Sequence, residues 1–278
     1  MMSLVGSLLT SGVLAVSFQG VITAGAVVGV IGLIIGILLG IAAKAFHVEV
    51  DERELFVRDL LPGNNCGGCG YAGCDALAKA IALGEAPVNA CPVANSEIHG
   101  KIGEVMGKSA EEKERLIAFV QCHGSCDKTT MKYNYHGAQS CKAAALAPGR
   151  GGKTCKYGCM GFGDCTRVCE FDAIHVVNGV AVVDREKCVA CSKCVLECPN
   201  NIIELVPESA DYKVACASKD KGKDVMAACS VGCIACMKCT KVCEVNAITV
   251  KDNIAYIDYS KCTRCGKCAE VCPRKIIV

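Results

Sequence analysis

The chain of 278 residues contains no tryptophan, and only 7 tyrosines and 6 phenylalanines. A large aromatic core therefore cannot organise the fold. The sequence also lacks a Gly-x-Gly-x-x-Gly pattern after a predicted strand, which would bind a dinucleotide, and it has no acid–base cluster beyond scattered histidines. The stretch 147–154, APGRGGKT, fits a phosphate-binding loop only loosely, because no buried strand precedes it. We therefore expect neither catalytic residues nor a nucleotide site in this chain.

What the chain has in abundance is cysteine, at 25 of its 278 positions. This density indicates either a disulfide framework or metal ligation. The odd count and the tight spacing favour metal ligation. Iron–sulfur clusters are favoured over zinc, because C-x2-C-x2-C places three thiolates too close together for the paired knuckles of a zinc site. An oxidised 4Fe-4S cluster with four thiolates carries about −2, so the formal net charge of +2 says little about partners.

One apolar stretch is long enough to cross a membrane. Residues 21–43, VITAGAVVGVIGLIIGILLGIAA, contain no ionisable side chain, and about 20 such residues span a bilayer as a helix. A cleaved signal peptide is the alternative, but the run exceeds the roughly 7 to 15 apolar residues of a signal peptide and no basic residue precedes it. We expect a single transmembrane helix whose glycine spacing lets another helix approach. Because cluster ligands must stay reduced, the soluble part is expected on the cytoplasmic side of the cell (inner) membrane.

A glycine-rich segment follows the apolar stretch. Its cysteines have the spacing C-x2-C-x4-C-x16-C and supply a complete ligand set for one 4Fe-4S cluster: Cys66, Cys69, Cys74 and Cys91. The intervening glycines allow tight turns and bring backbone N–H groups toward the sulfurs. A helix is predicted from Asp75 through Leu83, closed by Gly84. Zinc could use the same four thiolates and stays open at this site.

The C-terminal half contains an internal duplication. Residues 165–203 and 239–277 align without a gap at an offset of 74 and agree at 19 of 39 positions, including all six cysteines and a proline. Hairpins are predicted at 176–184 and 250–258, around Asn-Gly and Asp-Asn turns. Such strands, with short helices after the cluster motifs, predict α+β ferredoxin modules with two clusters each.

In two-cluster bacterial ferredoxins, three cysteines of a C-x2-C-x2-C-x3-C-P run hold one cluster and the fourth ligates the other. One predicted set in each module is therefore Cys188, Cys191 and Cys194 with Cys169, and Cys262, Cys265 and Cys268 with Cys243. The partner cluster of the second module takes Cys233, Cys236, Cys239 and Cys272, although whether Cys229 replaces Cys236 stays open. In the first module, the residue aligned with Cys236 is Phe162, which cannot be a ligand. We therefore expect Cys155 to complete the set of Cys159, Cys165 and Cys198.

The segment 107–150 is the least regular. A capping-box pattern, from Ser109 to Glu112, predicts a short charged helix that runs to Phe119. The segment also holds Cys122, Cys126 and Cys141, whose wide spacing is weak as a ligand motif. With Cys216 these cysteines could build another ligand site, but spare thiols are the favoured interpretation.

The combination of one N-terminal membrane helix, NCGGCGYAGC…CP, and ferredoxin modules with the variants YGCMGFGDC and VGCIACMKC resembles the B subunits of the Rnf family, membrane-bound ferredoxin:NAD oxidoreductases of bacteria. The resemblance implies an electron-transfer subunit of an ion-translocating complex. It would take electrons from soluble ferredoxin, relay them through about five 4Fe-4S clusters and pass them to partner membrane subunits. Flavin, nicotinamide and ion-transport chemistry would lie in other subunits, and no nucleic acid is involved.

These patterns divide the chain into five parts: a membrane anchor at 1–46, a glycine-rich 4Fe-4S domain at 47–106, a connector at 107–150, and two-cluster ferredoxin modules at 151–210 and 211–278. Two other functions stay open, a ferredoxin-like subunit of a different membrane oxidoreductase and a metal-stabilised assembly scaffold. Electron transfer is favoured over the scaffold, because a scaffold has no need for closely paired clusters.

Overall fold

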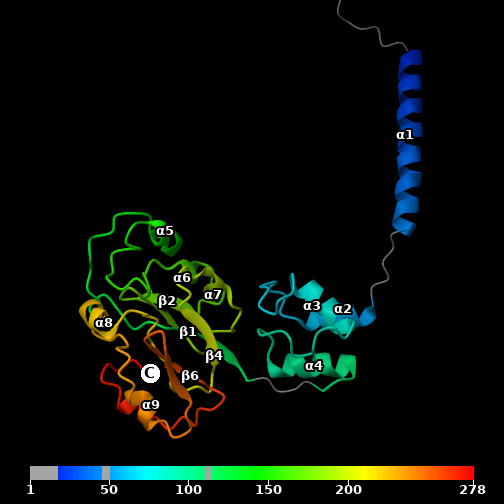
Figure 1. The fold of residues 1–278 in the computed structure, drawn as a ribbon. Coiled ribbons are helices and arrows are strands. Elements are labelled where there is room, and N and C mark those ends of the chain that lie inside the picture. The colour runs from blue at the N-terminus through cyan, green and yellow to red at the C-terminus, as the bar shows by residue number, and fades with distance from the viewer. Residues whose placement is uncertain (1–17, 46–50, 110–113) are drawn as a thin grey trace, which may run out of the picture. The chain divides into compact units, whose positions relative to one another are not determined.

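The computed structural model describes residues 18–45, 51–109 and 114–278 (Figure 1). The chain divides into two units, Met1–Val50 and Asp51–Val278. In the first unit, helix α1 (Phe18–Ala45) contains the predicted apolar run. Its window Gly25–Lys44 has a mean hydropathy of 2.8, and none of it is buried within the protein. This helix is long and apolar enough to cross a bilayer.

Three helices at the start of the second unit pack around one small core: α2 (Glu52–Leu60), α3 (Cys74–Ala82) and α4 (Ser96–Met106). The predicted helix after the third glycine-loop cysteine is confirmed as α3. It begins where the Asn65 side-chain oxygen accepts a 2.8 Å hydrogen bond from the backbone N–H of Cys74. It is followed by Gly84, whose φ of +77° suits glycine. The core consists of apolar side chains from all three helices, including Val57, Leu77 and Ile102.

The predicted charged helix up to Phe119 is wrong in the part that the structure describes. Residues 110–113 of that prediction lie outside the described residues, and Leu116–Val120 form strand β1. This strand pairs antiparallel with β4 (Ile203–Pro207), with Val120 opposite Ile203. The sequence LIAFV suits a half-buried strand, and pairing across more than 80 residues outweighs the local capping signal.

Each duplicated module has one hairpin and short helices after its cysteine motifs. The first hairpin, β2 (Ile174–Val177) with β3 (Val180–Val183), turns at Asn178 and Gly179, which have φ values of 47° and 74°. The second is β5 (Ile248–Lys251) with β6 (Ile254–Ile257). Both hairpins are where the sequence predicted them, with turns of the type that positive φ values allow. The helices are α5 (Cys141–Leu146), α6 (Asp164–Arg167), α7 (Lys193–Glu197), α8 (Gly222–Ala228), α9 (Lys238–Val242) and α10 (Lys267–Glu270).

The strand pair of β1 with β4 has a shorter counterpart in the second module. There, Val214 forms an antiparallel bridge with Ile277, the residue equivalent to Ile203 in the duplication. Next to each pairing, a backbone N–H donates a 2.7 Å hydrogen bond, from Gln121 to Ile202 and from Ala215 to Ile276. The segments 120–122 and 214–216 are therefore structural equivalents, although they lie outside the aligned duplication. Part of the connector at 107–150 thus packs as a strand of the first module.

Candidate iron–sulfur cluster sites

Two of the predicted ligand sets each line one cavity. Cys169, Cys188, Cys191 and Cys194 surround a cavity at the start of α7. Cys233, Cys236, Cys239 and Cys272 surround another at the start of α9. Of the two cysteines that the sequence left open, Cys236 lines this second cavity, whereas Cys229 lines a different one.

Cysteines of two further sets lie close enough to affect one another electrostatically. Burial raises the pKa of the Cys91 thiol, and negative charge on Cys69 and Cys74 raises it further. Burial likewise raises the pKa of Cys268, with Cys262 and Cys265 contributing in the same direction. Cys243 packs against the same core cluster as Cys268, and Cys66 precedes α3 on the glycine-rich loop.

In the first module the structure places Cys141, not Cys155, beside Cys159, Cys165 and Cys198. These four residues line one cavity, together with Asp164 and apolar neighbours. Burial raises the pKa of Cys165 to about 12, and the next contributions come from charge on Cys159 and Cys141. Cys155 lines a different cavity. The expected substitution of Cys155 for the missing cysteine is therefore not what the geometry favours.

Two contacts hold Cys141 at this cavity. Cys141 opens α5, and the buried Asp164 accepts hydrogen bonds from the Ser140 hydroxyl at 2.8 Å and from the Lys142 backbone N–H at 2.9 Å. Phe162, which stands in the place of a cysteine, packs its ring against Tyr135 with centroids 5.2 Å apart. Phe162 therefore contacts the segment that leads to Cys141.

Backbone N–H groups point at several of the sulfurs. The N–H of Ala181 donates to Cys159 Sγ at 3.4 Å, and that of Ala118 donates to Cys188 Sγ at 3.3 Å. The duplication repeats one such bond, from Ala173 to Cys169 and from Ala247 to Cys243, at 3.4 and 3.3 Å. Hydrogen bonds to the sulfurs are one way in which a protein sets the potential of an iron–sulfur cluster.

The donor sets suit a cluster better than a single ion. Within the described residues, no three His, Cys, Asp or Glu side chains converge as one metal ion requires. Zinc would need its sulfurs within about 2.3 Å of one point. Quartets of thiols that enclose a cavity instead fit a cubane, which occupies the space between them. Burial first, and then the negative charge of neighbouring thiolates, raise these thiol pKa values, and a cationic iron core among the sulfurs favours the thiolate form.

Comparisons with known families agree with this donor chemistry. Residues 61–93 match a family described as a putative Fe–S cluster domain. Residues 181–204 match a 4Fe-4S binding domain, and residues 232–276 match a 4Fe-4S dicluster domain.

Relatives cover nearly the whole chain. The B subunit of the Na⁺-translocating ferredoxin:NAD⁺ oxidoreductase complex of Acetobacterium woodii is 47% identical over 90% of this chain and 75% of its own length. The B subunit of an ion-translocating oxidoreductase complex of Methanosarcina acetivorans is 43% identical over 91% and 96%. This chain belongs to that family of B subunits. Its members also include the B subunit of a proton-translocating ferredoxin:NAD⁺ oxidoreductase complex of Clostridium ljungdahlii, 40% identical over 89% of this chain and 88% of the relative.

The family matches leave several cavity-lining cysteines uncovered, among them Cys122, Cys141 and Cys155. Spacing could not find Cys141, because it lies 18 residues before its nearest partner, Cys159. A signal for Cys155 was available. It is equivalent to Cys229 at the offset of 74, and an extra cysteine retained in both copies indicates a shared role.

Proposed function

We propose that this chain is the electron-transfer subunit of a membrane-bound ferredoxin:NAD oxidoreductase that couples electron flow to ion transport. It accepts electrons from reduced soluble ferredoxin and delivers them to partner membrane subunits. The observation that supports this most directly is the gathering of cysteines into neighbouring quartets within the modules. Bound 4Fe-4S clusters supply one-electron redox chemistry, and the residues of this chain hold them and adjust their potentials.

We assign five ligand sets, three supported by the sequence and a cavity and two by the sequence and the electrostatic proximity of their thiols. They are Cys66, Cys69, Cys74 and Cys91; Cys169, Cys188, Cys191 and Cys194; Cys141, Cys159, Cys165 and Cys198; Cys233, Cys236, Cys239 and Cys272; and Cys243, Cys262, Cys265 and Cys268. In domain terms, the anchor and the glycine-rich domain keep their predicted limits. We assign residues 114–210 to the first ferredoxin module, because β1 pairs with β4 and Cys141 lines a cavity of that module.

Helix α1 anchors the protein in the cell membrane as a single span, with the cysteine-rich part in the cytoplasm, where thiols stay reduced. Residues 21–43 carry no ionisable side chain, and such side chains mark most ion paths through membranes. The ion path therefore lies in partner subunits, which also determine whether Na⁺ or protons are carried. Glycines at 25, 29, 32, 36 and 40 give α1 a surface on which a partner helix can pack closely.

Rapid mixing tests electron acceptance. The full chain, purified anaerobically in detergent, is mixed with dithionite-free reduced ferredoxin while its visible cluster absorbance is followed. We expect bleaching within the turnover time of the complex. A scaffold would keep its absorbance on that timescale, and this result would exclude the proposal.

Alanine variants test the assignment in the first module. Cys141→Ala should lose about four iron atoms per chain, one 4Fe-4S cluster. The matched control is Cys126→Ala, because Cys126 is exposed and lines none of the four cavities. If Cys141→Ala retained as much iron as the control, Cys141 would not be a ligand, and another residue would complete this set.

A further inference from the structure

Two of the assigned cluster ligands are exposed, and both belong to the second module. They are Cys236 and Cys265, whereas every assigned ligand in the first module and in the glycine-rich domain is buried or half-buried. An electron passes only between centres that come close together. A soluble redox partner can therefore bring its own cluster nearest to this chain at the second module.

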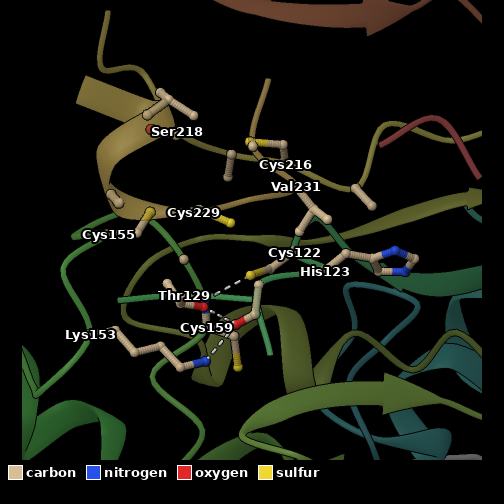
Figure 2. Close-up of a pocket in the computed structure, with 17 residues that line it drawn as sticks. Cys122, His123, Thr129, Lys153, Cys155, Cys159, Cys216, Ser218, Cys229 and Val231 are labelled. Atoms are coloured by element: carbon tan, nitrogen blue, oxygen red, sulfur yellow. Dashed lines mark hydrogen bonds between the residues drawn. The ribbon is translucent and has the colours of Figure 1, made fainter. Parts of the chain in front are cut away.

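The Cys236 set lies next to the first module. The backbone N–H of Cys233, a ligand of the same set, donates to Cys216 Sγ at 3.3 Å. Figure 2 shows Cys216 at a cavity that it shares with Cys159, a ligand of the first module. No ligand of the Cys265 set lines this cavity. The Cys236 set therefore borders the first module, which suits it to pass electrons inward.

The exposed Cys265 lies in a loop that has a counterpart in the first module. Residues 261–267, KCTRCGK, correspond to residues 187–193, KCVACSK, at the offset of 74. We call residues 261–267 the open loop, because the three residues at its centre, Thr-Arg-Cys, are exposed. In the counterpart, Ala190 is buried and Cys191 is half-buried. The two loops therefore serve equivalent cluster sites but differ in access from solvent.

Part of the glycine-rich domain covers the counterpart loop. A Cβ on Gly68 would lie 3.0 Å from the backbone carbonyl oxygen of Cys191. Burial raises the pKa of Cys191, and negative charge on Cys66 raises it further. The first module therefore presents this ligand to another cluster site of the same chain, whereas the second module presents Cys265 to solvent.

The second copy of the duplication is also the more basic one. Residues 165–203 contain four basic and five acidic residues, whereas residues 239–277 contain seven basic and four acidic ones. The formal charges of the two copies are therefore −1 and +3. One of the added charges lies in the open loop, where the exposed Arg264 stands at the position of Ala190.

The charged side chains of the open loop differ in their partners. Lys261 forms an ion pair with Asp258, and Lys267 forms one with Glu244. Among the ion pairs that the structure describes, none includes Arg264. Its guanidinium is thus available to a carboxylate of another molecule, which an arginine can bind through two parallel hydrogen bonds.

The backbone of the open loop does not depend on the arginine side chain. Arg264 has a left-handed φ of 58°, and Ala190 adopts the same conformation at 54°. The N–H of Arg264 donates to Cys262 Sγ at 3.4 Å, a bond that any residue with a backbone N–H can make. A negatively charged partner gives the exposed guanidinium a role, because opposite charges steer association and orient two proteins.

Reduced ferredoxin has the required charge. A 4Fe-4S cluster held by four thiolates carries about −2 when oxidised, and reduction adds one further negative charge. A protein that donates from such a cluster presents negative charge to its acceptor. The accepting cluster of this chain is negative as well, so basic side chains between the two clusters offset their repulsion.

We propose that the open loop is the surface on which reduced ferredoxin docks, with Arg264 bound to carboxylates beside the ferredoxin cluster. The cluster of Cys243, Cys262, Cys265 and Cys268 is then the first to be reduced. One electron leaves the ferredoxin cluster, which is oxidised, and enters this cluster, which is reduced, and no covalent bond changes. The inference rests on the proposed function, because it names the surface at which the proposed donor binds.

Stopped-flow mixing tests the role of Arg264. The full chain, purified anaerobically in detergent, is mixed with reduced ferredoxin at a series of salt concentrations. Arg264→Ala copies the residue of the first module, so we expect its iron content to match the wild type. Its second-order rate constant for reduction should fall about fivefold at low salt. At high salt the two rates should converge, because screening removes the attraction.

Lys251→Ala is the matched control. Lys251 is exposed and pairs with Ile254 at the turn end of the β5–β6 hairpin, opposite to the end that leads to the open loop. This variant removes the same charge from the same module and should keep the wild-type rate. Equal rates for Arg264→Ala and the control would overturn the docking role. So would a difference that persists at high salt, because Arg264 would then adjust the potential of its own cluster.

Crosslinking of the unchanged chain locates the surface even if the variant loses its cluster. A carbodiimide joins carboxylates to amines, and with oxidised ferredoxin we expect links at Lys261 and Lys267, identified by mass spectrometry. Links at Lys238, which lies near the exposed Cys236, would overturn the inference. Links from Lys261 to another subunit in the purified complex would do the same. A chain that ferredoxin does not reduce at all contradicts the proposed function itself, whereas a chain that is reduced but linked elsewhere contradicts only the docking surface.

Discussion

Lys153 is a buried cation at the cavity lined by Cys122, Cys155, Cys216 and Cys229. It is buried, and both of its hydrogen bonds go to neutral carbonyl groups. It is the next-to-last residue of the stretch that loosely matched a phosphate-binding loop, yet the structure places it at a cavity lined by cysteines. A fixed cation near a cluster favours the reduced form, because reduction adds negative charge.

Replacing this cation should lower one reduction potential. In Lys153→Met, we expect the midpoint potential of the cluster that Cys159 ligates to fall by about 50 mV, close to a tenfold change in a one-electron equilibrium, because the charge of Lys153 acts on that thiol. EPR-monitored redox titration of the full chain measures it. Lys132→Met is the control, because Lys132 is exposed and its ammonium donates to the carbonyl oxygen of Gly149. Unchanged potentials in Lys153→Met would show that no cluster lies near this ammonium.

Helix α5 shows how a short element can deliver a ligand that spacing does not reveal. It has only six residues, and such a helix has little stability of its own. Its N-terminus is held by the Ser140 cap and by Asp164 on α6. Burial alone would raise the pKa of the Asp164 carboxyl, but hydrogen bonds from the Lys142 N–H and the Ser140 hydroxyl hold it below its ordinary value.

Asp164→Ala should loosen α5 and the cluster that Cys141 ligates. It removes the acceptor for two partly buried hydrogen bonds, and we expect unfolding to become easier by about 1–3 kcal/mol at neutral pH. The pKa of Asp164 in the folded protein lies below its ordinary value of 3.8. The stabilisation by Asp164 is therefore complete above pH 3.8, and it is lost as the pH falls through the pKa of the folded state. Denaturant unfolding and the rate of iron loss to a chelator measure both effects. The exposed Asp172→Ala is the control, and equal iron loss in the two variants would contradict the positioning role.

The loop before α6 contains a glycine whose backbone packs closely against the first hairpin. Gly161 has a φ of +83°, and a Cβ there would lie 2.6 Å from the carbonyl oxygen of Gly179. We expect Gly161→Ala to cost about 1–3 kcal/mol of stability. Gly100→Ala, within α4 and with no atom within 4 Å of the added Cβ, should instead be neutral or stabilising. Anaerobic denaturant titration compares them, and equal stabilities would refute the steric argument.

The two units of the chain differ in the surface that they expose. The described side chains of α1 between Gly25 and Ala43 are apolar and none of them is buried, as in a helix long and apolar enough to cross a bilayer. The three core clusters lie entirely within residues 51–278. The cysteine-rich unit therefore needs no contribution from the anchor to form its cores.

Removing the anchor should change the location of the protein and leave its cofactors in place. A chain that begins at Asp51 is expected in the soluble fraction with the same iron content as the full chain, whereas the full chain sediments with membranes. Fractionation and iron analysis test this. Loss of iron from the shortened chain would show that α1 takes part in holding the clusters.

The elements that the sequence predicted well are local ones. Both hairpins follow from turn residues that accept positive φ, and α3 follows from its apolar pattern and the glycine after it. The strand β1 was missed because its partner β4 lies more than 80 residues away, and no local sequence pattern near Leu116 predicts that pairing. Cys141 was missed for the same reason, since the fold brings it to Cys165 from a separate segment.

The sequence by itself indicated which chemistry this protein performs, because its closely spaced cysteines recur in runs that match the ligand spacing of two-cluster ferredoxins, and this spacing is set by the covalent chain. It also determined the apolar helix and the duplication. Only the tertiary structure decided which cysteine joins Cys159, Cys165 and Cys198 at their cavity, where Cys141 lies and Cys155 does not. That choice depends on strand pairing and on a short helix held by a buried carboxylate, and both are long-range contacts that no local pattern encodes.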